Sequence, residues 1–204
     1  MGMLEYFLLT FTTLFAIVDP PAAVPAFLAM TPRDSVASRR RMALTAAVTS
    51  GVVLAVFAAS GPAIFKLFGI TMPAFQVAGG LILLLSALDM LRGKRSPLKE
   101  TAEETEAGAA KDDIAITPLA IPMLSGPGAI TTAIVLFGRA HGAAHKAVLF
   151  ACIALVALCS YGTLYVAAAG AKRLSPIALN VIERLMGLLL SAIGVQFILS
   201  VLKP

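Results

Sequence analysis

The chain has 204 residues, of which 59% are hydrophobic and 13% are charged, and its formal net charge is +5. Soluble domains carry about 25% charged residues, so this composition excludes an ordinary soluble domain and favours a membrane protein. The basic residues lie mainly between apolar stretches. This placement favours charge that sets membrane topology over a nucleic-acid-binding surface. The lipid bilayer is therefore the expected partner, and nucleic acid is not.

Six apolar stretches are each long enough to span a bilayer, which takes a helix of about 20 residues. They cover residues 4–30, 42–65, 71–91, 114–137, 146–169 and 177–202. Because backbone polar groups must be satisfied inside the bilayer, we expect an all-α fold with six transmembrane helices. The first stretch has no basic segment before it and no small-residue cleavage pattern, so we expect it to be retained.

Two proline-rich motifs interrupt the first and fourth stretches, about 106 residues apart. One reads Asp-Pro-Pro-Ala-Ala-Val-Pro at residues 19–25, and the other reads Ser-Gly-Pro-Gly-Ala-Ile-Thr at residues 125–131. Proline lacks a backbone N–H and disturbs the preceding turn, so transmembrane helices 1 and 4 are expected to be broken. Such breaks at membrane depth are tolerated where they are buried in protein or line a cavity, and paired breaks point to a transporter's binding site.

The breaks also indicate an internal repeat. The sequence Leu-Leu-Leu-Ser-Ala occurs at residues 83–87 and again at 188–192, an offset of 105. We therefore expect two three-helix repeats, 1–91 and 114–204, which have opposite orientations because each contains an odd number of spans. Residues 92–113 form a charged linker between them, interpreted as a cytoplasmic tether rather than a regulatory segment.

The distribution of basic residues predicts the orientation. Eleven Lys and Arg residues lie in the loops after spans one, three and five, whereas four lie on the opposite side. Because positive charge collects on the cytoplasmic side, we expect the first set to be cytoplasmic. Both termini are then predicted on the extracytoplasmic side.

Several motifs resemble those of the MarC family of bacterial inner-membrane proteins. That family has an Asn-Pro-x-Gly-x-x-Pro element in its first span and a Gly-Pro-Gly-Ala-Ile-Ser/Thr-Thr element in its fourth. Residues 126–132 here read Gly-Pro-Gly-Ala-Ile-Thr-Thr, a close match, whereas Asp19 and Ala22 stand where Asn and Gly are usual. Residues 79–91 and 184–199 look like the family's third and sixth spans, so the resemblance covers nearly the whole chain. It implies a bacterial inner-membrane location, and similar proteins transport small neutral amino acids; the family also looks related to amino-acid exporters of the lysine-exporter type.

The breaks predict a substrate site between the two halves. Each break starts a half-helix whose first N–H groups are unpaired and carry positive partial charge, which suits a carboxylate. Asp19 is expected to cap its own half-helix, with a proline at the first helical position. We therefore expect span four, with the hydroxyls of Thr131 and Thr132, to bind an amino acid's carboxylate, and Asp19 with released carbonyls to bind its ammonium group. The predicted substrate-binding residues are Asp19, Pro20, Ala22, Ala23, Ser125, Gly126, Gly128, Ala129, Thr131 and Thr132.

The combined prediction is a secondary transporter or exporter of small neutral amino acids, with coupling to a proton or to sodium left open. Asp19 is either a proton-coupling residue or a helix cap, and the family's usual Asn favours the cap. Two alternatives remain: efflux of another small metabolite or drug, and a non-transporting membrane scaffold or stress factor. The sequence has no phosphate-loop, zinc-ligand or intramembrane-protease motif, so no enzyme activity, metal or cofactor is expected. Gly51, Ala55 and Ala59, spaced four residues apart, are interpreted as helix-packing residues.

Overall fold

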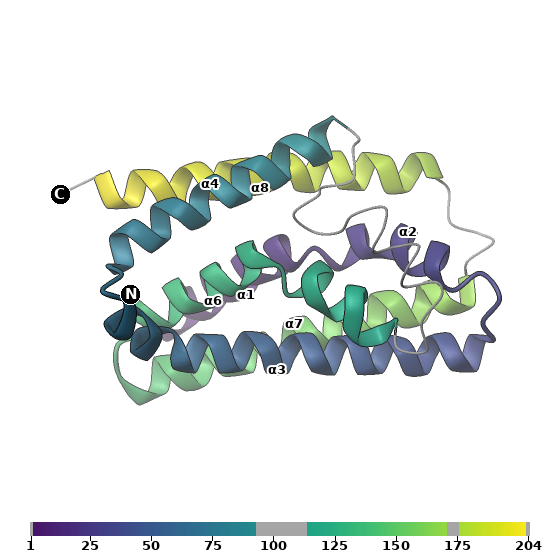
Figure 1. Ribbon diagram of the computed structural model, residues 1–204, viewed down its shortest axis with the longest axis horizontal. Coiled ribbons are helices and arrows are strands. Elements are labelled where there is room, and N and C mark those ends of the chain that lie inside the picture. The colour runs from purple at the N-terminus through teal and green to yellow at the C-terminus, as the bar shows by residue number, and fades with distance from the viewer. Residues whose placement is uncertain (1, 93–113, 171–175, 203–204) are drawn as a thin grey trace.

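A computed structural model describes residues 2–92, 114–170 and 176–202, and every regular element within these ranges is a helix. In chain order the elements are α1 (Met3–Val18), α2 (Pro20–Met30), α3 (Val36–Phe68), α4 (Met72–Leu91), η1 (Ala115–Leu124), α6 (Pro127–Gly138), α7 (Gly142–Gly170) and α8 (Pro176–Leu202). They run roughly along the long axis of the molecule (Figure 1). α4 packs beside α8 and α3 packs beside α7, while α1, α2, η1 and α6 lie between these two pairs.

The helices have the length and surface of membrane spans. Within the described residues, five helical segments are long and apolar enough to cross a membrane, the first being α1 and α2 taken together (Met3–Met30). η1 with α6 qualifies as a sixth span with a bend of 60°. Large apolar side chains point outward on these helices, including Val52, Leu85 and Leu188, which are 56%, 55% and 61% exposed. Such exposed apolar surface suits hydrocarbon rather than water. The prediction of an all-α integral membrane protein is thus confirmed, with five or six candidate spans.

Local sequence explains where the long helices begin and end. The Ser35 hydroxyl accepts a hydrogen bond from the Ser38 N–H at 3.1 Å and caps the start of α3. Gly69 ends α3 with a φ of 65°, a left-handed conformation in which glycine carries no side-chain penalty. Thr71 then caps α4 by accepting from the Ala74 N–H at 3.3 Å. α3 and α4 are therefore joined by a short turn, which begins at Gly69 and ends at the Thr71 cap.

One residue, Asp19, separates α1 from α2. Its φ of 50° and ψ of 63° are left-handed, a conformation that Asp tolerates better than most residues with a side chain. The Asp19 N–H donates to the Phe15 carbonyl at 3.0 Å and closes α1. Pro20 and Pro21 follow at the first two positions of α2. The chain thus turns at a single residue in this first motif.

The second motif changes the chain's direction over a longer segment. η1 is a wide, π-type helix in which Thr117 and Ile121 have extended φ and ψ values. Each directly precedes a proline, which disfavours helical conformation in the residue before it. The Ser125 N–H donates to the Ala120 carbonyl at 2.9 Å, across five residues. The next helix, α6, then departs at 60°.

The core lies in the middle of the molecule, where the interrupted helices meet the long ones. Tyr6, Phe27 and Leu119 are fully buried there. The Tyr6 hydroxyl donates to the Leu136 carbonyl at 3.0 Å and links α1 to α6. At the α4–α8 contact, a Cβ placed on Gly80 would lie 2.7 Å from the Gly194 carbonyl oxygen. Glycine therefore permits the close backbone approach that holds this helix pair together.

Candidate functional site

The first turn of α6 lines a small cavity, named the central cavity because both halves of the chain line it. The cavity has a volume of about 20 Å³, which is room for about one water molecule. Four parts of the chain contribute to it: α1, α4, α8, and the end of η1 with the start of α6. The residues that line it are Ile17, Ile82, Leu83, Ser86, Met123, Gly126, Pro127, Gly128, Ala129 and Leu190. The cavity therefore lies between the chain before residue 92 and the chain after residue 113.

The start of α6 is an electropositive helix end inside this cavity. Gly126 is the N-cap residue, and its position carries no capping side chain. Pro127 occupies the first helical position, so Gly128 and Ala129 supply the first N–H groups, which have no partner within the helix. Such groups, together with the positive end of the helix dipole, favour a bound anion.

Close packing at the cavity requires the two glycines. A Cβ on Gly128 would lie 2.6 Å from Leu83 Cδ2 and 3.7 Å from Ile17 Cγ2. A Cβ on Gly126 would lie 2.8 Å from the Pro122 carbonyl oxygen. Because the Gly126 neighbour is backbone, it cannot move aside as a side-chain tip can. The cavity and the open N–H groups both depend on the absence of side chains here.

The first motif differs from its expected role. Asp19 is 1% exposed and precedes α2, but its side chain makes no capping hydrogen bond to that helix. The prediction that Asp19 caps its own half-helix is therefore wrong. The two positions after Asp19 are prolines without N–H groups, and the Ala22 N–H is bonded to the Asp19 backbone carbonyl at 3.1 Å. The first turn of α2 therefore has no free N–H group from which the Asp19 carboxylate could accept a hydrogen bond.

The hydroxyls near the second motif bond within their own segments. Thr131 donates to the Pro127 carbonyl at 2.8 Å, and Thr132 donates to the Gly128 carbonyl at 2.8 Å. The Ser125 hydroxyl donates to the Ala120 carbonyl at 2.7 Å. A substrate carboxylate needs hydrogen-bond donors, and these three hydroxyls already donate to backbone carbonyls. The donors that remain in this region are the N–H groups of α6.

The ten predicted site residues fall into two sets. Gly126, Gly128 and Ala129 line the central cavity. The others do not line it: Asp19, Pro20, Ala22, Ala23, Ser125, Thr131 and Thr132. Sequence reasoning missed Ser86, which supplies a hydroxyl to the lining and is buried. Its only sequence signal is its place in the repeated Leu-Leu-Leu-Ser-Ala motif.

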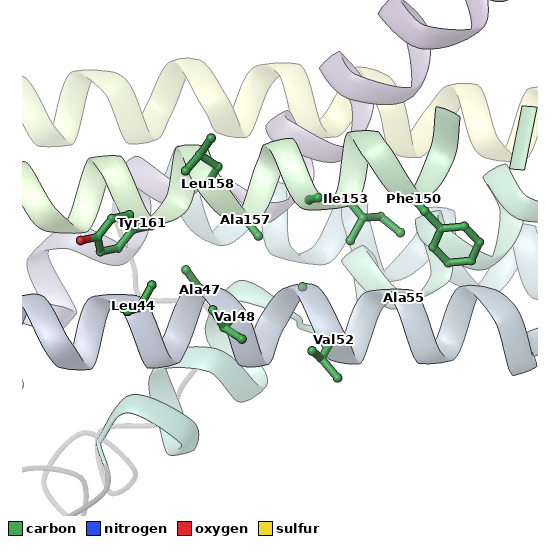
Figure 2. A pocket seen from close by; sticks show the side chains of 12 residues that line it. Leu44, Ala47, Val48, Val52, Ala55, Phe150, Ile153, Ala157, Leu158 and Tyr161 are labelled. Carbon is green, nitrogen blue, oxygen red and sulfur yellow. The ribbon is translucent and has the colours of Figure 1, made fainter. Parts of the chain in front are cut away.

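A larger groove lies between α3 and α7 (Figure 2). Its volume is about 440 Å³ and its lining is almost entirely apolar. The α3 residues that line it are Leu44, Ala47, Val48, Gly51, Val52 and Ala55, and the α7 residues are Phe150, Ile153, Ala154, Ala157, Leu158 and Tyr161. Each α7 residue lies 106 positions after one of the α3 residues, so the two helices contribute at matching positions. Gly51 and Ala55, predicted as packing residues, both belong to this groove.

Metal-ligating residues do not gather in the part of the chain that the structure describes: no three His, Cys, Asp or Glu side chains there could hold one ion. The His145 ring instead packs edge-on against Tyr6, with 4.9 Å between the ring centroids. The candidate site is therefore the central cavity, with α6 N–H groups as its polar component.

Comparison with known proteins agrees with this architecture. The family model described as MarC family integral membrane protein matches residues 4–204. The chain belongs to the MarC family. Among MarC relatives, the UPF0056 membrane protein YhcE of Escherichia coli is 37% identical over 193 residues, which cover 95% of this chain and 90% of YhcE. A UPF0056 membrane protein of Methanocaldococcus jannaschii is 38% identical, covering 97% of this chain and 96% of that protein. YvbG of Bacillus subtilis is 36% identical, covering 98% and 96% respectively.

The MarC relatives match over nearly their whole length. Their names state a membrane protein and specify no substrate. No solved structure matches the chain. The best indication of function is therefore the geometry of the central cavity.

Proposed function

We propose that this MarC-family protein is a secondary transporter of small neutral amino acids, whose carboxylate binds at the start of α6. The observation that carries the proposal is the small cavity at an uncapped helix N-terminus between the two halves of the chain. Half-helix N-termini that point at a substrate carboxylate are a recurring feature of secondary transporters. The substrate class rests on the resemblance to proteins that transport small neutral amino acids.

The two halves are proposed to form an inverted repeat. Support comes from the α3–α7 groove, whose lining residues pair at a spacing of 106, the spacing of the two proline-rich motifs. Gly51 and Ala157 are one such pair, and a Cβ on Gly51 would lie 3.1 Å from the Ala157 Cβ. Equivalent residues of two repeats meet only near the axis that relates them. The packing is also reciprocal, since α3 contacts η1 and α6 while α7 contacts α1 and α2.

Alternating access is part of the proposal, and the small volume of the cavity supports it. About 20 Å³ holds one water molecule, whereas even glycine has five heavy atoms. Substrate entry therefore requires the halves to separate around the start of α6, as in transporters whose repeats rock around a fixed site. Asp19 lies two residues after Ile17, a lining residue, and in this proposal it faces the substrate's ammonium group when the cavity widens.

The proposal includes the orientation predicted from the basic residues, with both termini on the outer side of the bacterial inner membrane. Labelling tests this directly. In a variant without Cys152 and Cys159, a cysteine at Gly2 should react with a membrane-impermeant maleimide in intact cells, whereas a cysteine at Arg33 should react only after lysis. The reverse pattern would contradict the orientation.

The function is tested by counterflow of radiolabelled alanine, serine and glycine into proteoliposomes. Wild type should show saturable exchange, and Gly128→Leu should abolish it, because the new side chain fills the cavity and collides with Leu83. Gly162→Leu is the matched control, since nothing lies within 4 Å of a Cβ at Gly162 and the residue is exposed on α7.

Each outcome of the counterflow experiment has a clear meaning. Exchange retained by folded Gly128→Leu would remove the site from the start of α6. If folded wild-type protein exchanges none of the three amino acids, the substrate class is wrong, and other small metabolites or a scaffold role become the candidates.

A further inference from the structure

The groove between α3 and α7 opens to the outside of the helix bundle and is apolar along its length. Its outer wall residues Leu44, Val52 and Leu158 are 48%, 56% and 61% exposed. Small residues such as Ala47 and Ala157 form its floor, where α3 and α7 approach closely: a Cβ on Gly51 would lie 3.1 Å from the Ala157 Cβ. A volume of about 440 Å³ falls within the range of roughly 300–1,000 Å³ typical of small-molecule sites. None of its residues lines the central cavity, so the groove is separate from the proposed transport site.

One end of the groove carries a cation. Arg40 lies one helical turn before Leu44, and its guanidinium carbon is 4.0 Å from the centroid of the Tyr165 ring. The Tyr165 ring in turn lies 5.5 Å from that of Tyr161, a groove residue. The contacts thus run without interruption from the charged group into the apolar groove.

Arg40 differs from its neighbour in what it binds within the protein. Arg39 donates to the Thr31 carbonyl from Nε at 2.9 Å and from a terminal nitrogen at 2.6 Å, so its guanidinium is already used. The Nε of Arg40 is buried and has no hydrogen-bond partner among the residues that the structure describes. Because this Nε is buried, an external acceptor would have to approach the terminal nitrogens of the half-buried Arg40 side chain.

We propose that this groove binds one anionic phospholipid, with its phosphate at Arg40 and an acyl chain between α3 and α7. A guanidinium presents paired donors that match phosphate geometry, and stacking on Tyr165 holds it in place. Fifteen residues separate Arg40 from Ala55, a rise of about 22 Å along α3. This length lies within a hydrocarbon core of about 30 Å, so a chain anchored at Arg40 can lie along the groove.

The alternative occupant is a second copy of the protein. A partner helix over this face would bury the Arg40 end against apolar side chains, because the exposed residues of the groove are aliphatic or aromatic. An unpaired cation at such an interface is unfavourable. The charge at the groove's end therefore favours a lipid, and the second copy becomes an outcome of the test.

The chain contains no Trp, so a single introduced Trp reports one position without background. We would place it at Leu44, four residues after Arg40, and in a separate variant at Leu88, four residues before Arg92. Both positions are similarly exposed, at 48% and 43%, but Leu88 lies on α4 away from the groove. The measurement is fluorescence quenching by brominated phosphatidylglycerol and by brominated phosphatidylcholine in reconstituted bilayers, at 0.1 M and 1 M salt.

At Leu44→Trp we expect phosphatidylglycerol to be preferred about five-fold, the factor expected for one basic residue at an anionic surface. The preference should persist at 1 M salt, because partly buried pairs are screened less than exposed ones, whereas any preference at Leu88→Trp should disappear. Arg40→Gln should abolish the preference at Leu44→Trp. Ala154→Phe, which leaves Arg40 in place and fills the groove, should abolish it as well.

Three results would overturn the proposal. The first is a phosphatidylglycerol preference that falls equally with salt at Leu44→Trp and at Leu88→Trp, which would indicate ordinary boundary lipid. The second is a preference that survives both Arg40→Gln and Ala154→Phe. The third is a Leu44→Trp reporter that neither brominated lipid quenches, which would indicate that a second copy covers the groove.

Discussion

The two proline-rich motifs occupy matching positions in the chain, yet they present opposite chemistry. Asp19 corresponds to Ser125 at a spacing of 106, and Ala22 corresponds to Gly128. At the first motif, prolines remove the N–H groups of the first turn and a carboxylate is buried. At the second, glycines leave N–H groups open toward a cavity, and the nearby hydroxyls bond within their own segments.

Under the proposed function, this difference would let two similar breaks bind the two charged groups of one substrate. A repeat with identical breaks would present two similar helix ends, which suit two similar groups. In the proposed site, the first break would supply the Asp19 carboxylate and the second would supply backbone donors, which together suit the proposed zwitterionic substrate. Changes made in parallel at both motifs should therefore have unequal effects.

The largest difference is expected for leucine at the two equivalent small residues. Gly128→Leu should abolish amino-acid exchange and lower stability by about 1–3 kcal/mol, because overpacking strains a well-packed core. Ala22→Leu should leave exchange within about two-fold of wild type, since Ala22 is partly exposed and does not line the cavity. Exchange in proteoliposomes and thermal unfolding in detergent measure the two effects. Equal loss of exchange in both folded variants would contradict the difference between the motifs.

An intermediate effect is expected at Asp19, where backbone and carboxylate roles can be separated. Asp19→Ala should lower stability by roughly 1 kcal/mol, because alanine tolerates the left-handed conformation poorly. Asp19→Gly relieves that strain and should unfold close to wild type. Both variants should bind amino acid at least ten-fold more weakly if the carboxylate faces the ammonium group, which equilibrium binding would measure. Unchanged affinity in folded Asp19→Gly would remove Asp19 from the site.

Asp19→Asn addresses the coupling ion at the same position. Asparagine keeps the shape and tolerates the left-handed backbone, but it cannot exchange a proton. If Asp19 couples transport to protons, uptake driven by a pH gradient should disappear while counterflow continues. Preserved proton-driven uptake in Asp19→Asn would reject the coupling role. The comparison therefore distinguishes a proton carrier from a fixed charge at one residue.

Sequence reasoning predicted an all-α membrane protein because this follows from composition, and it proposed two interrupted spans from proline's missing N–H. It did not predict the lining residues Leu83, Ser86 and Leu190, since these come from α4 and α8 and their approach to α6 is set by tertiary packing. The capping error at Asp19 has a local cause that was readable in principle, because two prolines leave a carboxylate no donor in the first turn. The α3–α7 groove depends on the relative register of two helices, which a single sequence does not reveal.

The smallest effect is expected from the threonines that follow the second motif. Both hydroxyls donate to carbonyls four residues earlier in α6, so they have no proton to offer a substrate carboxylate. Thr131→Val and Thr132→Val should therefore keep exchange within about two-fold of wild type. Each should lose about 0.6 kcal/mol of stability, the average measured for side-chain hydrogen bonds in a membrane protein. Loss of exchange in folded Thr132→Val would mean that its hydroxyl turns to the substrate when the cavity opens. The carboxylate site would then include side chains, and the contrast between a charged first motif and a backbone-only second motif would no longer hold.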